Sequence, residues 1–259
     1  MSLFSTSYIL AVFLIFIRVG SLIMTAPYFN SAAFPKKIKL FFALITSFLL
    51  TFVIPSESVI GQVEPTLSFL VTAVIMEALV GIAMGLVGQL VFAGIEMAGQ
   101  LISLKITLSF AQIVNTMTQQ KSDLVGNVFG MLAVLIFLSM DGDKIYIQGL
   151  ARSFEVIPLN QAELQYAGPF MLEVANYLFK IAVQIAAPFL IVLFILDLSL
   201  AIFARVMPQA NIMFIAIPIK LLLGFTLLSW ILPYLPDAFS SMFDQLFNYI
   251  VEVLSVMTV

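Results

Sequence analysis

The sequence predicts an all-α protein that crosses a membrane several times. Hydrophobic residues make up 62% of its 259 residues and charged residues only 10%, whereas a soluble domain carries about 45–50% and about 25% of these two classes. The apolar residues stand in long continuous runs and do not alternate with polar residues, which favours membrane helices over transmembrane strands. These observations exclude a soluble globular enzyme.

About six runs reach or approach the roughly 20 apolar residues that a membrane-spanning helix needs. They cover residues 8–26, 40–56, 66–95, 124–140, 178–204 and 212–236. The charged stretch 141–177 contains several turn signals, so we expect an outside loop there, with a short helix that begins near Phe170. No linker, low-complexity tract or clear internal repeat divides the sequence. We therefore expect one helical membrane domain over residues 1–259.

The composition limits the chemistry that the chain can perform. It contains no cysteine and no histidine, which removes disulfides, the commonest metal ligands and a Ser-His-Asp triad. Neither a phosphate-binding P-loop nor a dinucleotide-binding glycine motif occurs in it. A net charge of −3 offers no basic surface for nucleic acid. We expect no catalytic residue, no metal site and no cofactor, and we expect contact with membrane lipid.

Four charged residues lie inside apolar runs, where an unpaired charge is costly: Arg18, Glu77, Asp197 and Lys220. One interpretation is a pathway for protons or ions. The other is that they form buried pairs or interhelical hydrogen bonds that fix an assembly. We favour the second, because the carboxylates are scattered and not clustered. Together with Arg205, the last two are expected to hold the C-terminal helices in register between subunits.

Two pairs of glycines are spaced four residues apart, Gly81 with Gly85 and Gly126 with Gly130. This spacing of small residues lets two helices approach each other closely. Packing within the chain and packing between subunits are equally compatible with it.

The stretch from Gly99 to Lys121 is polar for a membrane segment and carries few charges. Its Ser, Thr, Asn and Gln residues stand among large apolar residues, as in an amphipathic helix at the membrane surface. The alternative is a segment that lines or fills a water-filled path, where irregular backbone at membrane depth is tolerated. Both interpretations fit these residues.

Short motifs in a characteristic order extend over almost the whole chain. They are Arg18-Val19-Gly20, Ala26-Pro27-x-Phe29, Pro35 with a basic cluster, Glu77-x-x-x-Gly81-x-x-x-Gly85, Gly99, Ser153-Phe154 with Pro158, Ala187-Pro188, Asp197-Leu198, Ala204-Arg205-x-x-Pro208-Gln209-x-Asn211, Pro218-x-Lys220 and Gly224. With these residues the sequence resembles the FliR/SctT family of type III secretion export-gate proteins, in particular its flagellar members, the FliR proteins. No single motif is decisive, but their order and spacing together are specific.

This resemblance implies a non-enzymatic part of the flagellar export gate. Members of the family assemble with FliP and FliQ into a closed helical cone, with FlhB as a further partner, and so build the conduit through which unfolded flagellar subunits leave the cytoplasm. The implied location is the flagellar basal body in the bacterial inner membrane. The helical hairpins would then be packed against partner subunits and would not span lipid as a simple bundle.

The resemblance also implies a role for the loop between the third and fourth runs, which is expected to plug the conduit when no substrate is present. Phe110, Ile113 and Met117 offer the bulk for a seal. Leu108 shares one helical face with Leu101, Leu104 and Ala111, and this face can dock on the conduit wall.

The alternative function is an ion-coupled small-molecule transporter. Such a protein needs broken helices in two related halves, with binding groups near the middle of the membrane. Pro188 and Pro218 would supply broken helices in the second half, but the first half has no matching pair.

Overall fold

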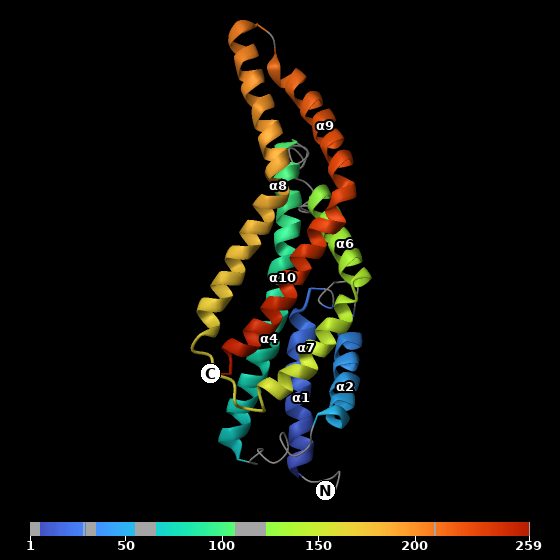
Figure 1. Cartoon of the computed structure of the whole chain (residues 1–259), viewed down its shortest axis with the longest axis vertical. Coiled ribbons are helices and arrows are strands. Elements are labelled where there is room, and N and C mark those ends of the chain that lie inside the picture. The colour runs from blue at the N-terminus through green and yellow to red at the C-terminus, as the bar shows by residue number, and fades with distance from the viewer. Residues whose placement is uncertain are drawn as a thin grey trace. The chain divides into compact units, whose positions relative to one another are not determined.

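The computed structural model describes residues 6–27, 29, 35–54, 66–106, 123–209 and 211–258. Every regular element within these ranges is a helix, which confirms the all-α prediction (Figure 1). The elements are α1 (Thr6–Thr25), α2 (Lys36–Val53), α4 (Leu67–Lys105), α6 (Leu124–Ser139), α7 (Gly142–Val156), α8 (Ala167–Val206), α9 (Ile212–Ile231), the short 3-10 helix η1 (Leu232–Tyr234) and α10 (Leu235–Val256).

Within the described ranges, four helical stretches are long and apolar enough to cross a membrane. They are Tyr8–Thr25, Leu67–Lys105, Ala167–Val206 and Ile212–Val256. The pair α6 and α7, bent by 68°, supplies a fifth if it is counted as one broken span. The protein is therefore a polytopic helical membrane protein, and four or five of the six apolar runs fall on helices of the described ranges that are long and apolar enough to cross a membrane. The run at 40–56 falls short because α2 begins with three lysines in its 18 residues.

Two helices are much longer than a bilayer requires. α4 has 39 residues and α8 has 40, which at about 1.5 Å per residue gives nearly 60 Å. The hydrocarbon layer is only about 30 Å thick. Neither helix can keep all of its length inside lipid unless it tilts steeply.

The stretch 141–177 is not the outside loop that its charges suggested. Residues 142–156 form α7, and α8 begins at Ala167, three residues before the predicted helix start at Phe170. α7 is amphipathic. Tyr146, Leu150 and Phe154 are buried at helical spacing, while Lys144, Arg152 and Glu155 are exposed. The turn signals mark only the bend before α7, where Asp141 has a φ of 57°, and the short connection to α8.

The prolines inside the long helices do not break them. α8 continues through Pro188 and α9 continues through Pro218. The interruption lies instead at Leu232–Tyr234, where a 3-10 turn separates α9 from α10. The broken helices that a transporter would need at Pro188 and Pro218 are therefore absent from the described structure.

The described residues separate into two compact units. The first takes its residues from 1–90, 138–175 and 243–259. Its core joins α1, α4, α7 and the end of α10; for example, Gly149 of α7 faces Met84 and Ile250, and the rings of Phe170 and Tyr249 meet edge to face at 6.0 Å. This unit buries side chains well, and it holds the charged site described below.

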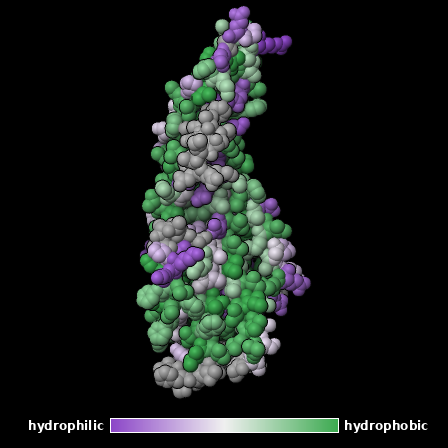
Figure 2. All heavy atoms as spheres, turned by 180° about the vertical axis from the view of Figure 1, so that it is seen from behind, coloured by the Kyte–Doolittle hydropathy of each residue, from purple (hydrophilic) through white to green (hydrophobic). Residues whose placement is uncertain are grey.

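The second unit takes its residues from 91–137 and 176–242. The rings of Phe92 and Phe137 lie 5.5 Å apart and those of Phe129 and Phe239 6.1 Å apart, so α4, α6 and the start of α10 pack together. α8 and α9 in contrast expose large apolar side chains; Phe214 is 79% exposed. Hydrophobic residues cover much of the molecular face seen in Figure 2. The single domain over 1–259 stays a prediction.

Candidate functional site

A buried ion pair between α1 and α4 is the centre of the first unit. Nε of Arg18 donates to Oε2 of Glu77 at 2.5 Å, and the two side chains are 0% and 1% exposed. Two of the charges that the sequence places inside apolar runs are thus each other's partners.

The remaining donors of Arg18 bind the end of α7. One terminal nitrogen donates to the backbone oxygen of Ser153 at 2.9 Å and to its hydroxyl at 3.2 Å, and the other donates to the backbone oxygen of Ile157 at 3.0 Å. The guanidinium also lies 4.2 Å from the ring centroid of Phe154. A cation is favourable here, because the C-terminal end of a helix carries the negative end of its dipole. The oxygen of Ser153 accepts the N–H of Ile157 as well as the guanidinium. Arg18 therefore caps α7.

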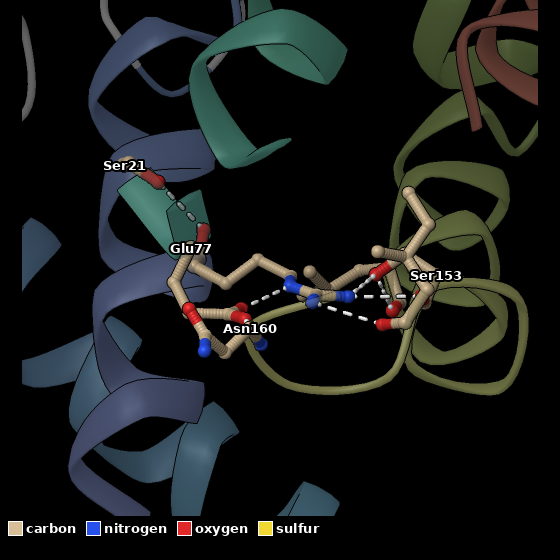
Figure 3. A network of polar contacts seen from close by, with 7 residues as sticks. Ser21, Glu77, Ser153 and Asn160 are labelled. Atoms are coloured by element: carbon tan, nitrogen blue, oxygen red, sulfur yellow. Dashed lines mark hydrogen bonds and ion pairs between the residues drawn. The ribbon is translucent and has the colours of Figure 1, made fainter. Parts of the chain in front are cut away.

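Glu77 fixes the chain that follows this cap. Its second oxygen, Oε1, accepts a hydrogen bond from the backbone N–H of Asn160 at 3.1 Å. Asn160 has a left-handed backbone, with a φ of 63°, which asparagine tolerates better than most residues. Figure 3 shows Glu77 and Asn160 on one side of this network and Ser153 on the other. The network ties α1, α4 and the end of α7 together, with both charges hydrogen-bonded.

The first glycine pair packs α4 against α1 one turn beyond this network. A Cβ placed on Gly81 would overlap the hydroxyl of Ser21 and the backbone oxygen of Arg18, and one on Gly85 would overlap the side chain of Thr25. The small-residue spacing therefore serves packing within the chain. It also brings the backbone of α4 close enough for Glu77 to reach Arg18.

A second ion pair joins α8 and α9 in the second unit. Nζ of Lys220 lies 2.5 Å from Oδ1 of Asp197, with side-chain exposures of 18% and 34%. Arg205, in the last turn of α8, is exposed, and no ion pair or hydrogen bond joins it to the described part of the chain. The structure thus pairs Asp197 with Lys220 and leaves Arg205 on the surface.

The second glycine pair lies where α6 meets α4. A Cβ on Gly99 would come within 2.6 Å of the Cα of Gly126, so the two backbones nearly touch. Gly130 lies beneath the side chain of Glu96, whose Oε1 would be 2.8 Å from a Cβ at position 130. Asp123 begins α6 and accepts the backbone N–H of Gly126 at 3.0 Å. These small residues also pack helices of one chain.

The four predicted plug residues, Leu108, Phe110, Ile113 and Met117, lie outside the described residues, so their role stays a prediction. Across the ranges that the structure describes, no group of three or more acidic residues is close enough to hold a metal ion.

Sequence reasoning missed four participants of these sites, which are Ser153, Ile157, Asn160 and Glu96. Ser153 and Asn160 bind the buried pair mainly through backbone groups, and backbone groups leave no mark in composition. The signature Ser153-Phe154 with Pro158 was the available signal, since it spans the segment that Arg18 caps. Glu96 lies one residue beyond the predicted run 66–95, whereas α4 continues to Lys105 and includes it.

These features define a class: a polytopic helical membrane protein in which charged side chains bind helices to one another. The chain belongs to the bacterial export proteins, family 1, whose family model matches residues 9–246.

Flagellar proteins are among its relatives. The chain is 31% identical over 231 residues to the flagellar biosynthetic protein FliR of Caulobacter vibrioides, which covers 88% of this chain and 91% of the relative. It is 30% identical to FliR of Escherichia coli K12 over 92% of this chain and 90% of the relative, and 32% identical to FliR of Aquifex aeolicus over 94% and 93%. The resemblance to flagellar FliR proteins is confirmed, and the chain is a membrane-embedded protein of the flagellar export apparatus.

Proposed function

We propose that this chain is a non-catalytic conduit subunit of the flagellar type III export gate in the bacterial inner membrane. It assembles there with FliP-like and FliQ-like subunits, with an FlhB-like protein as a further partner. Unfolded flagellar subunits pass through the resulting channel. The observation that carries the proposal is the hairpin of α8 and α9, which combines an exposed apolar surface with charged residues.

The hairpin suits a protein environment better than a lipid one. Large apolar side chains such as Phe214 and Leu222 are exposed on this chain, so they require an apolar environment supplied by lipid or by another protein. Pure lipid would serve them, but Asp197 and Lys220 on the same hairpin are partly exposed. Charges that face hydrocarbon are costly, whereas helices of partner subunits can supply both apolar and polar contacts.

The length of the helices points the same way. α8 is far longer than the bilayer core, so part of an exposed apolar helix would lie beyond the hydrocarbon layer. Packing against other subunits covers such a helix outside lipid. A protein conduit built from several helical chains provides these neighbours.

Coexpression tests the assembly. A tagged chain is produced alone and together with FliP-like and FliQ-like subunits, extracted in mild detergent and analysed by size-exclusion chromatography. We expect the chain alone to aggregate or be degraded, and the three chains to elute as one complex. Because the chain has no native cysteine, Leu222→Cys can then be cross-linked to single cysteines in the partners. A stable, monodisperse single chain that ignores its partners would overturn the proposal.

The conduit role has a separate test in the predicted plug. Removing residues 106–116, or combining Phe110→Gly with Ile113→Gly, is expected to leave the complex intact and to make the membrane permeable to ions and small solutes. The permeability is measured in cells that make the complete gate without export substrate. If the assembled gate stays tight after the deletion, the segment is not a plug, and the amphipathic surface helix becomes the better interpretation.

A further inference from the structure

Glu96 is an exposed charged residue inside one of the described membrane-capable helices. It lies in α4, a helix of 39 residues whose other charges are Glu77 and Lys105. Glu77 is buried and bound by Arg18, whereas Glu96 is exposed. No hydrogen bond or ion pair joins its carboxylate to any residue in the described part of the chain. A carboxylate in this position calls for a partner from outside.

The surroundings of Glu96 hold its side chain in a defined place. Gly130 of α6 lies directly beneath it, and a Cβ there would come within 2.8 Å of Oε1 and 3.1 Å of Cγ. The close approach of Gly99 and Gly126 brings α6 to this position. The carboxylate thus rests on the glycine of a neighbouring helix and does not extend freely from the surface.

The surface around Glu96 is otherwise mostly apolar. Leu104 of α4 and Met131 and Leu135 of α6 are exposed, and Gln100, one turn after Glu96, adds an amide on the same helix face. Asn127, one turn before Gly130 on α6, is also exposed, and so is Lys105 at the end of α4. A mostly apolar surface with one carboxylate and two amides is complementary to a helix that carries a basic side chain among apolar residues. A carboxylate that faced lipid without a binding partner would instead be energetically unfavourable.

We propose that Glu96 accepts a lysine or arginine side chain from a helix of a partner subunit, and that Gly130 positions the carboxylate for this contact. The proposal rests on the assembly proposed above. It adds a second contact surface, formed by α4 and α6, to that of the α8–α9 hairpin. The charge on the partner is opposite in sign to Glu96, so the contact selects the partner and its register.

Coexpression of the complete set of subunits tests this contact. The wild-type chain must first form the complex; if it does not, the assembly proposal fails, and this contact, which rests on it, fails with it. In Glu96→Lys, two like charges would face each other, which opposes association, so we expect at least about a tenfold loss of complex. Glu96→Gln keeps the shape and is expected to lose less. The control Glu155→Lys reverses an exposed carboxylate of α7 and should assemble normally.

Three further results distinguish a contact from a folding defect. The amount of chain in membranes without partners should be equal for wild type and Glu96→Lys. Gly130→Ala should reduce complex formation in the wild type and have no further effect in Glu96→Ala, which lacks the side chain that the new methyl group would displace. Suppressors of Glu96→Lys should replace a basic residue in a partner subunit. Wild-type assembly of Glu96→Lys, or suppressors found only within this chain, would overturn the proposal.

Discussion

The two interhelical ion pairs have the same length and different surroundings. Arg18–Glu77 and Asp197–Lys220 each span 2.5 Å, but the first is 0% and 1% exposed and the second is 34% and 18% exposed. The further hydrogen bonds of the Arg18 side chain all go to the capped end of α7, within the first unit. In the second pair, Asp197 and Lys220 bind only each other within the described part of the chain. They lie on a hairpin with an exposed apolar surface.

This difference separates folding from assembly. A fully buried pair has lost its hydration and must be satisfied by its own chain before the unit can form. A partly exposed pair still has polar atoms that can bind another subunit after the chain has folded. The first unit therefore carries charges that complete its own fold, whereas in the assembly proposed above the charges of the second unit are the ones that a partner would cover.

The largest expected effect is loss of one member of the buried pair. Glu77→Leu leaves the Arg18 guanidinium without its counter-charge, and removing one partner of a buried pair costs about 3–5 kcal/mol. We expect the chain to disappear from membranes even when all partner subunits are present. The amount of tagged chain in purified membranes measures this.

The control for this prediction is the third ion pair of the described chain. Lys144 and Asp141 are 66% and 65% exposed, and solvent screens such exposed pairs so that they contribute little to stability. Lys144→Gln should therefore leave the amount of chain unchanged. If Glu77→Leu reached the same amount in membranes as Lys144→Gln, the buried network would not determine folding. The proposed difference between the two ion pairs would then be wrong.

The next effect concerns the half-exposed pair. Asp197→Leu and Lys220→Met should leave the chain on its own at wild-type levels, because the pair contributes little before assembly. Complex formation with FliP-like and FliQ-like subunits should fall severalfold. Normal complex formation with lost export would instead assign the pair to ion movement and not to assembly.

The close helix contact at Gly81 should give a smaller effect. Gly81→Ala places a methyl group against the backbone oxygen of Arg18, and overpacking of this kind costs about 1–3 kcal/mol. The thermal stability of the assembled complex in detergent should fall. Gly168→Ala is a matched control, since nothing lies within 4 Å of a Cβ at that position. Equal stability of the two variants would show that α4 can move away from α1 freely.

The sequence predicted the elements of this fold better than their ends. Continuous apolar runs identify a membrane helix, but they do not show where it ends. α4 extends ten residues beyond the predicted run 66–95, through the more polar residues 96–105. α7 was missed because its charged residues are more conspicuous than the helical spacing of Tyr146, Leu150 and Phe154.

The candidate site was predictable in its charges and not in its pairing. Arg18 and Glu77 are conspicuous because charge is rare in apolar runs, but they stand 59 residues apart, and a single sequence gives no distance between them. The backbone oxygens of Ser153 and Ile157 could not be recognised at all, because every residue has one. The glycines at 81 and 130 were recognised as packing residues, while the neighbours they face depend on the tertiary fold.

The smallest expected effect lies at Asn160, on the edge of the buried network. Only its backbone N–H binds Glu77, so the side chain can change if the left-handed backbone, with φ of 63°, is kept. Asn160→Gly adopts this conformation without a steric penalty, and the stability of the complex should change by less than about 0.5 kcal/mol. Asn160→Val, a branched residue, should cost about 1–2 kcal/mol. Thermal unfolding of both variants measures the difference. If Asn160→Gly were as harmful as Asn160→Val, the asparagine side chain itself would be part of the network, and the buried pair would depend on more than the backbone contact described here.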